Sequence, residues 1–586
     1  MKLFSRNKRT ISGYQPILPT RKHWPVVQLS QQQDKFVDEV IMSSMERLLA
    51  EAPNAYQLID ELETTLYRER LRIRQNPWAV DPEDEETFWK NIKKQLVELS
   101  THHTSSDEAS LAAHFEQAKA ILKEIVSRYA HEISSTFKPS SYRVARSLVT
   151  FGFARLLNAS RVKGFRSFYS NQYSLRDKIN IIGEVEQLRE LAQKGTIVMV
   201  PTHFSNLDSI LIGWVIHELG LPPFIYGAGL NLFNIKVLAY FMNSLGAYKV
   251  DRRKKNKVYI ETLKAYSRQA IRWGCHSLFF PGGTRSRSGK VEDKLKLGLL
   301  GTAMEAQRLN YEESAKSGEE AEKIFVVPVV LNYHFVLEAP SLIRDYLRIE
   351  GQERYYVETD EYSTSSKIIR FLFQFFTEGS DISVSFGKAM DLMGNPVDKD
   401  GRSLDKHGRV ISMREYFYSN GKIRRDTQRE SEYTRMLGEA ILKSYHINNR
   451  VFSSHLVAFT AFQMIKQKYP YLDLYNLLRI PEDEQVLDYD NFRTAFNTLR
   501  EEVFRLHKAG KVDIAPHLTQ QIDQAITHGL DNVGLYHSKR PLLKNKEGNI
   551  ITHDLNTLFY YHNRMEGYGL ERFFKPQNQK SQISEK

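Results

Sequence analysis

The chain has 586 residues, of which 41% are hydrophobic and 26% are charged, a composition typical of a globular protein. This length predicts two or three domains, because a single hydrophobic core rarely grows so large. The only cysteine, Cys275, excludes an intramolecular disulfide framework and a cysteine-based zinc site. A net charge of +12 favours anionic partners, which include phosphorylated metabolites, acidic lipid headgroups and nucleic acid.

Residues 1–160 are predicted to form a basic arm and a helical region. The arm, residues 1–22, contains six lysines and arginines and no acidic residue. Each such cation contributes roughly 1 kcal/mol to binding when it lies near an anionic leaflet; the alternative is a solvated tail. From about residue 33, apolar residues recur every three or four positions, which is the period of one helix face. The same period predicts helices over residues 112–137 and 142–157.

Residues 161–392 have a different pattern and are predicted to form an α/β domain. Short β-branched runs occur at residues 196–200, 277–280, 324–330 and 382–386, with helical segments between them. Strands that alternate with helices are typical of a central sheet covered by helices. We expect a mixed sheet with helices on both faces.

Residues 393–586 are predicted to be mostly helical, after a turn-rich boundary at residues 394–401. No stretch of the sequence has the pattern of a membrane-spanning helix. The nearest candidate, residues 219–248, contains two prolines and four glycines that would break a helix. We expect this segment to be buried or to insert partly into the bilayer interface, as in a peripheral membrane protein.

The first candidate for chemistry is the sequence V-P-T-H-F-S-N-L-D at residues 200–208. It places His203 just ahead of a helix predicted over residues 207–218, and Asp208 in the first turn of that helix. A carboxylate there can bind one imidazole nitrogen and leave the other as a general base. The alternative is a capping box in which Asp208 only complements the helix dipole. A second H-x4-D, His102 to Asp107, lies in a polar stretch, so the spacing also arises by chance.

The second candidate is the sequence F-P-G-G-T-R-S-R-S-G-K at residues 280–290, which directly follows a predicted strand. Two successive glycines allow backbone N–H groups to converge on an anion, and an arginine can bind phosphate oxygens with two hydrogen bonds. The spacing is not that of a nucleotide P-loop. A basic surface turn is the alternative. The predicted anion ligands of this turn are Thr284, Arg285, Ser286, Arg287 and Lys290, with the N–H groups near Gly282 and Gly283 as a possible oxyanion site.

A third cationic segment lies at residues 246–257. Arg252 closes an apolar stretch, and we expect it to point toward the site, whereas Lys254 to Lys257 are expected to form a solvated face. Residues 327–330 are expected to be a buried strand that forms a wall of the site.

The remaining histidines and the cysteine are expected to be structural. His217, His276 and His334 border apolar segments, where a hydrogen-bonded core histidine is the common case. Cys275 has no basic neighbour in sequence and is expected to be buried and unreactive. No cluster of histidines and carboxylates has the spacing of a metal site, so no metal is expected.

In their order, these pieces resemble the motifs of the glycerolipid acyltransferase family. That family carries H-x4-D, then G-x5-R, then F-P-E-G-T-R-S, and then a strand with a central proline. The corresponding residues are His203 and Asp208, Gly246 to Arg252, Phe280 to Ser286, and the strand around Pro328. The resemblance covers roughly residues 190–390. The stretch from Arg287 to Leu300 resembles most the large glycerol-3-phosphate acyltransferases, which also flank the catalytic domain with helical regions.

This resemblance implies acyl transfer from acyl-CoA or acyl carrier protein to the sn-1 hydroxyl of glycerol 3-phosphate. His203 would be the general base, Asp208 would orient it, and Arg252, Arg285 and Lys290 would hold the phosphate. No cofactor is implied. The expected location is the cytoplasmic face of a membrane, the inner membrane in a bacterium, with an anionic membrane surface as partner and the apolar residues around 219–248 receiving the acyl chain.

One position departs from the family pattern. The glutamate of the third motif is Gly282 here, so its work must be done differently or not at all. Three alternatives follow. The acceptor could be 1-acylglycerol 3-phosphate (lysophosphatidate) or dihydroxyacetone phosphate, or the chain could be a catalytically weakened lipid-binding protein, or its basic charge could serve nucleic-acid binding. No nucleic-acid module is recognisable, and we expect no nucleic-acid partner.

Overall fold

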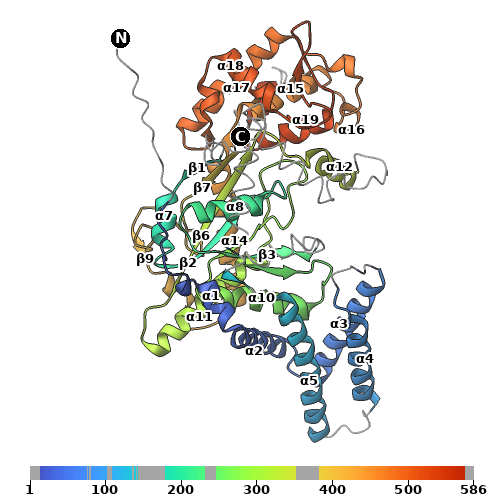
Figure 1. Cartoon of the computed structure of the whole chain (residues 1–586), viewed down its shortest axis with the longest axis vertical. Helices are drawn as coiled ribbons and strands as arrows, with labels where there is room; N and C mark the ends of the chain where they lie inside the picture. Colours follow the sequence, from blue (N-terminus) through green and yellow to red (C-terminus); the bar gives the residue numbers. More distant parts are fainter. Residues whose placement is uncertain are drawn as a thin grey trace, which may run out of the picture.

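The computed structural model describes residues 14–75, 77, 81–101, 108–134, 137–139, 142, 179–230, 246–351 and 382–574. These residues form an elongated molecule with N-terminal helices at one end, a sheet in the middle and C-terminal helices at the other end (Figure 1). The arm at residues 1–13, the second H-x4-D, the helix predicted after Tyr142 and residues 231–245 of the apolar segment lie outside the described residues.

The described N-terminal part is helical, as predicted. Buried apolar residues of these helices share one core with Ile225, Tyr248 and Tyr266, which belong to the α/β part of the chain. The N-terminal helices are therefore not a separate globule with a core of their own. Their bounds are η1 Arg21–His23, α1 Pro25–Gln31, α2 Gln33–Glu51, α3 Ala55–Gln75, α4 Glu85–Thr101 and α5 Glu108–Ile133.

The central sheet has seven strands in the order β1-β7-β6-β2-β5-β3-β4. Neighbouring strands are parallel except for the antiparallel pair β6–β7, so the sheet is mixed as expected. The four predicted strands are present, and β1, β3 and β4 were missed. The bounds are β1 Ile179–Gly183, β2 Gly195–Pro201, β3 Ile225–Gly229, β4 Ala247–Val250, β5 Ser277–Leu278, β6 Lys323–Tyr333 and β7 Ile382–Phe386.

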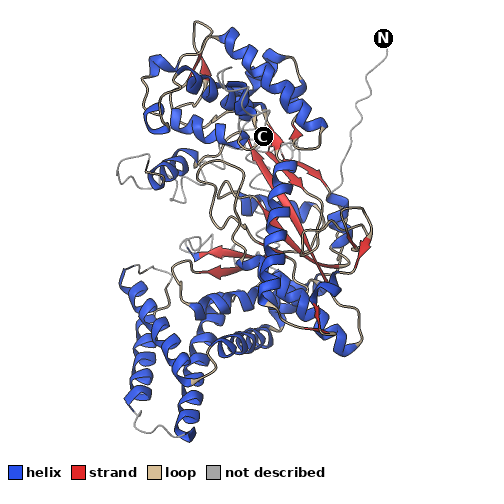
Figure 2. Cartoon of the chain, turned by 180° about the vertical axis from the view of Figure 1, so that it is seen from behind, coloured by secondary structure: helices blue, strands red, loops and turns tan. Residues whose placement is uncertain are grey.

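Helices cover both faces of this sheet (Figures 1 and 2). Because side chains alternate along a strand, Ile197 and Met199 of β2 pack in one core with α8, whereas Val198 and Val200 pack in another with α11 and α14. The helices of this part are α7 Val185–Leu191, α8 Asp208–Glu218, α10 Lys257–Arg272, α11 Gly298–Ser317, α12 Ala339–Ile349 and α14 Thr427–Asn448.

The C-terminal part is mostly helical, as predicted, and α15 is its central helix, with α17, α18 and α19 packed around it. The apolar residues of α15 share a core with the face of the sheet that α8 covers. The helices are α15 Ser453–Lys468, α16 Leu474–Leu477, α17 Tyr489–Lys508, α18 Ile522–Asn532 and α19 Leu555–His562, with η5 Met413–Phe417, η6 Glu482–Gln485, η7 Pro516–Thr519, η8 Asn563–Met565 and η9 Leu570–Phe574. The short strands are β8 Ser403–Leu404, β9 Val410–Ile411, β10 Tyr418–Ser419, β11 Lys422–Ile423, β12 Arg450–Val451, β13 Asp513–Ile514, β14 Leu543–Lys544 and β15 Ile550–Ile551.

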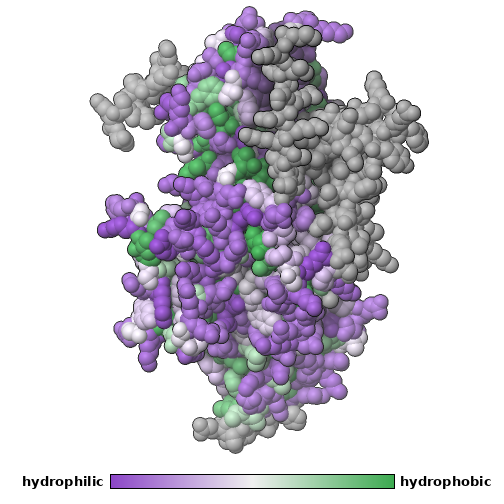
Figure 3. Space-filling model, turned by 60° about the vertical axis from the view of Figure 1, so that its left-hand side comes forward, coloured by the Kyte–Doolittle hydropathy of each residue, from purple (hydrophilic) through white to green (hydrophobic). Residues whose placement is uncertain are grey.

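The surface drawn in Figure 3 is mainly hydrophilic, with small separate apolar areas. Within the described ranges, no helix has both the length and the apolar character to cross a bilayer. Residues 219–225, the described start of the apolar segment, are buried.

A buried ion network joins the N-terminal helices to the loop after β4. Lys254 is only 3% exposed, and its Nζ lies 2.5 Å from Glu132 Oε2 and 3.7 Å from Glu85 Oε1. Arg253 pairs with Asp81 and Asp251. The prediction that Lys254 lies on a solvated face was therefore wrong, because carboxylates more than 100 residues away in sequence bury it.

The network predicts a large effect of one substitution in this loop. Lys254→Met should lower the free energy of unfolding by about 3–5 kcal/mol, because removing one partner leaves buried carboxylates without compensation. Lys255→Met is the matched control, since Lys255 is exposed, and should change the free energy by less than about 0.5 kcal/mol. Urea unfolding followed by tryptophan fluorescence measures both, and equal midpoints would contradict the role of the network.

Candidate active site

The candidate active site lies where several parallel strands end. β2, β5, β3, β4 and β6 run in the same direction, so their carboxyl ends meet at one edge of the sheet. Ligands of α/β sheets bind at this edge. The loops that carry His203, Arg252 and Arg285 leave β2, β4 and β5 there, and β6 supplies Tyr333.

His203 lies in the loop between β2 and α8. The loop is anchored to β6, because the N–H of Thr202 donates to the oxygen of Val329 at 3.0 Å and the N–H of Leu331 donates to Thr202 Oγ1 at 3.0 Å. The ring of Phe280 stacks on the imidazole with centroids 4.1 Å apart. The position and the plane of the imidazole are thus both fixed.

The predicted pair of His203 and Asp208 is formed. Nδ1 of His203 lies 2.8 Å from Oδ2 of Asp208, and Asp208 is completely buried. The same Oδ2 accepts the N–H groups of Phe204 and Ser205 at 2.6 and 2.9 Å, and Oδ1 accepts the hydroxyl of Tyr333 at 2.5 Å. With the carboxylate as acceptor, Nδ1 of the neutral imidazole carries the proton and Nε2 is the basic nitrogen.

Of the two hydrogen bonds of the alternative, a capping box, only one is formed. Asp208 accepts the N–H of Ser205, as a box requires, but Ser205 Oγ accepts the N–H of Leu207. The capping residue of α8 is Leu207, whose side chain makes no cap. Asp208 therefore both orders the start of the helix and binds the imidazole.

The glycine-rich turn lies directly against the histidine loop. The N–H of Ser286 donates to the oxygen of His203 at 2.7 Å. Sequence reasoning expected the two motifs to be neighbours, and the structure brings them together. The turn itself is closed by the N–H of Gly283, which donates to the oxygen of Phe280 at 3.0 Å. Of the two predicted oxyanion donors, Gly283 is therefore occupied within the turn, and Gly282 stays a prediction.

Two guanidinium groups share this edge. Arg285 Nη1 lies 3.3 Å from Oε1 of the buried Glu338, which also accepts hydrogen bonds from Ser205 Oγ and the N–H of Asn206. Arg252 has no ion pair with any described residue. Its pKa is lowered, first by desolvation and second by the charge of Arg285. Two cations that repel each other, only one of which is paired with a carboxylate, are suited to bind an anion.

The other predicted anion ligands differ in what they contact. Thr284 and Arg287 are exposed. Ser286 Oγ donates to the oxygen of Lys290 at 2.9 Å, so its hydroxyl helps to hold the turn. Lys290 forms an ion pair with Glu566, and that contact raises the pKa of Lys290.

Sequence reasoning missed two groups beside the histidine. The backbone N–H of His203 donates to Oε1 of Glu292 at 2.8 Å. Glu292 is partly buried with its Oε2 atom fully buried, and desolvation raises the pKa of its carboxyl to about 7. Arg564 is buried as well, its guanidinium lies 3.9 Å from the ring centroid of Phe204, and burial lowers its pKa to about 10. Neither residue had a signal in sequence, because no family motif includes Glu292 and Arg564 lies 360 residues after Phe204.

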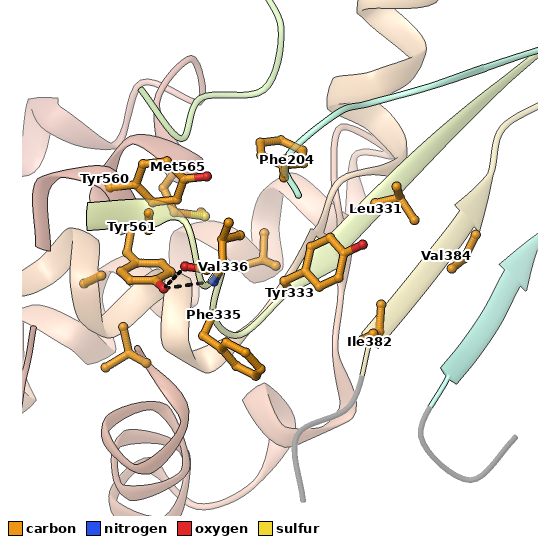
Figure 4. Packing of buried hydrophobic residues seen from close by; sticks show 14 of the residues in the cluster. Phe204, Leu331, Tyr333, Phe335, Val336, Ile382, Val384, Tyr560, Tyr561 and Met565 are labelled. Carbon is orange, nitrogen blue, oxygen red and sulfur yellow. Dashed lines mark hydrogen bonds between the residues drawn. The ribbon is translucent and has the colours of Figure 1, made fainter. Parts of the chain in front are cut away.

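The C-terminal part closes one side of the site. Tyr560, Tyr561 and Met565 lie against the end of β6 and near Phe204, and the hydroxyl of Tyr561 binds the backbone of Val336 (Figure 4). Arg564 Nη2 donates to the oxygen of Leu331 at 2.6 Å.

This part also covers the glycine-rich turn. Asn563 Nδ2 donates to the oxygen of Ser288 at 2.8 Å. Gly289 has a φ of +83°, and a Cβ there would come within 2.1 Å of the oxygen of Tyr560. Only glycine fits this contact.

The residues predicted to be structural are buried or partly buried. His276 Nδ1 accepts the N–H of Ile197 at 3.1 Å, and burial lowers its pKa to about 4. Cys275 is buried, and burial raises the pKa of its thiol. His217 is partly buried in α8.

Among the described residues, one histidine group has ring nitrogens close enough to be considered for a metal: His334, His517 and His528, within 4.8 Å of one another. The N–H of Ser453 donates to His517 Nε2 at 2.8 Å, and Ser454 Oγ binds His334 Nδ1 at 2.9 Å. His517 Nε2 accepts the backbone N–H, and a ring nitrogen that accepts a hydrogen bond has no lone pair left for a metal. We interpret the group as hydrogen-bonded packing beside α15.

Comparison with known proteins agrees with this geometry. The family model described as Acyltransferase matches residues 183–332. Three curated relatives are named glycerol-3-phosphate acyltransferase. The protein of Pseudomonas aeruginosa (strain UCBPP-PA14) is 27% identical over 53% of this chain, that of Shewanella loihica (strain ATCC BAA-1088 / PV-4) is 28% identical over 43%, and that of Pseudoalteromonas translucida (strain TAC 125) is 27% identical over 41%.

The alignments cover only 26–32% of the length of these relatives, so they concern one part of each protein. The matched residues of this chain include β2, α8 and the loops that hold His203, Asp208, Arg252 and Arg285. By these matches and the order of its motifs, the part of the chain around residues 183–332 is similar to the acyltransferase domains of glycerol-3-phosphate acyltransferases.

Proposed function

We propose that the chain transfers an acyl group from an acyl thioester, on coenzyme A or acyl carrier protein, to the sn-1 hydroxyl of glycerol 3-phosphate. The product is lysophosphatidate, a precursor of phospholipids. The observation that supports this most is the ordered pair of His203 and Asp208, in hydrogen-bond contact with the turn that carries Arg285. The names of the relatives support glycerol 3-phosphate as the acceptor.

In this reaction, Nε2 of His203 takes the proton of the acceptor hydroxyl as its oxygen attacks the thioester carbonyl. The new C–O bond forms, the C–S bond breaks, and the imidazolium returns the proton to the thiolate that leaves. Asp208 keeps the ring oriented and stabilises its charged form. The hydroxyl of Tyr333 and the N–H groups of Phe204 and Ser205 stabilise the Asp208 carboxylate through the cycle.

Arg252 and Arg285 bind the phosphate of the acceptor, with Thr284 and Arg287 at the exposed side of the turn. In the free protein Glu338 holds Arg285, and the phosphate competes with this carboxylate for the guanidinium. Lys290 joins only if the phosphate displaces Glu566. Such clamps lower the barrier by fixing the hydroxyl beside the base.

The protein acts as a peripheral enzyme at the cytoplasmic face of an anionic membrane. The net charge of +12 favours that surface. The apolar residues around 219–248 are the proposed binding region for the acyl chain.

The first test removes the base. His203→Ala should lower kcat by about 10²–10⁴-fold, which is the usual contribution of general-base catalysis. Asp208→Asn should also lower kcat, because an amide binds the imidazole less strongly than a carboxylate. His407→Ala is the control, since His407 is exposed in the loop between β8 and β9. Transfer of a labelled acyl group gives the rates, and a wild-type rate for His203→Ala would contradict the role of His203 as general base.

The second test concerns the phosphate. Arg252→Ala should raise KM for glycerol 3-phosphate about 10–100-fold with a smaller change in kcat, because a hydrogen bond between charged groups contributes about 1.5–3 kcal/mol. Lys255→Ala, a change in an exposed cation of the same loop, should leave KM unchanged. Steady-state rates at varied acceptor and fixed donor separate the two constants. An unaltered KM would contradict the proposal that Arg252 binds the phosphate of the acceptor.

The third test identifies the acceptor. Purified protein is incubated with labelled acyl donor and, separately, with glycerol 3-phosphate, dihydroxyacetone phosphate and lysophosphatidate. We expect glycerol 3-phosphate to have the highest kcat/KM. A preference for either of the other two acceptors would leave acyl transfer as the proposed reaction and replace glycerol 3-phosphate as the proposed acceptor. Binding of the donor with no transfer to any acceptor would instead identify a lipid-binding protein.

A further inference from the structure

The side chain of Glu292 lies in the space beside Gly282. A Cβ added to Gly282 would come within 3.2 Å of Cγ and 3.4 Å of Oε1 of Glu292. Position 282 is where the family motif has its glutamate. The carboxyl of Glu292, from another part of the same loop, therefore lies beside the residue from which the family's glutamate side chain extends.

Glu292 contacts the histidine loop from this place. Its Oε1 accepts the backbone N–H of His203 at 2.8 Å, and this N–H belongs to the residue that carries the base. The Oε2 atom is buried and has no hydrogen-bond partner among the described residues. A carboxyl that is desolvated for a single hydrogen bond is expensive for folding. Such a group is typical of a functional site, where activity outweighs stability.

We propose that Glu292 is the positioning residue of the catalytic base and replaces, from ten residues downstream, the carboxyl that the chain lacks at position 282. By holding the N–H of His203, Glu292 sets where Nε2 lies relative to the acceptor hydroxyl. This role rests on the proposed function, because it concerns the same base. The loss of the motif glutamate is thus an exchange of position and not a loss of activity.

The two carboxyls compete for one space. A Cβ at position 282 would be tight against the side chain of Glu292, which would have to shift by a few tenths of an ångström, and two carboxyls this close would repel each other. Arg564 and Asp208 are the charged groups that act on Glu292 from other elements, with Arg564 favouring the ionised carboxyl and Asp208 opposing it. The site therefore accommodates one additional carboxylate, at either place.

The experiment uses four variants of the full chain and compares kcat and KM. Glu292→Ala should lower kcat by about 100-fold with little change in KM, since a base displaced by about 1 Å loses this much. Glu292→Gln keeps an oxygen acceptor for the N–H of His203 and should retain most of the activity. Gly282→Glu should be impaired because its side chain displaces Glu292 and adds a second carboxyl that repels it. The double variant Gly282→Glu with Glu292→Ala should recover at least tenfold over Glu292→Ala. Glu319→Ala, a change in an exposed glutamate, is the control.

A second measurement does not depend on activity. Hydrogen exchange followed by mass spectrometry reports the N–H groups of the peptide around residues 201–207. Exchange in this peptide should be faster in Glu292→Ala than in the wild type, and restored in Glu292→Gln and in the double variant. Circular dichroism and thermal midpoints identify any variant that fails to fold. If Glu292→Ala fails to fold, the kcat values of Glu292→Gln and of the double variant still test whether Glu292 positions the base.

The outcomes are distinguishable. A wild-type kcat in Glu292→Ala, or a double variant no better than Glu292→Ala, would contradict the proposal that Glu292 replaces the carboxyl missing at position 282. If the wild type itself transfers no acyl group, the proposed function fails while hydrogen exchange still decides whether Glu292 holds the loop. Unchanged exchange in Glu292→Ala would overturn the positioning role in either case.

Discussion

A buried carboxylate beside an imidazole depends on the donors that surround it. Asp208 is fully buried, and it is stable there because two backbone N–H groups, one tyrosine hydroxyl and the imidazole bind its two oxygens. These donors come from the loop after β2 and from the end of β6. The pairing of β2 with β6 therefore keeps these donors in place around the Asp208 carboxylate and beside the imidazole of His203.

The two helical flanks contribute to the same edge of the sheet. The N-terminal helices surround the segment after β4 with carboxylates, and this holds the loop of Arg252 while leaving that arginine exposed. The C-terminal part places Arg564 against Phe204 and binds the backbone of the glycine-rich turn. Both flanks share hydrophobic cores with the α/β part. The chain is thus better described as one catalytic unit with extensions than as three independent domains.

Sequence reasoning found the elements whose signals are local. The strands β2, β6 and β7 contain β-branched residues, β5 continues into two phenylalanines, and all four strands are almost entirely buried. The pair of His203 and Asp208 follows from a strand, a turn and a helix in succession. It missed β3, where two glycines in five residues hide the strand pattern, and β4, which has only four residues. It misjudged Lys254, because the carboxylates that bury this lysine come from helices far away in sequence. Glu292, Glu338 and Arg564 could not be predicted for the same reason: their contacts are made only by the tertiary fold.

The contact between Gly289 and Tyr560 ties the glycine-rich turn to α19, the last described α-helix. Some 270 residues separate the two in sequence, so the turn is completed only by a segment synthesised much later. During translation the loops of the candidate site emerge from the ribosome first, and the segment that covers them emerges later. In a nascent chain, His203 therefore lies beside a glycine-rich turn that stays uncovered until α19 and the residues after it, including Asn563 and Arg564, have been synthesised.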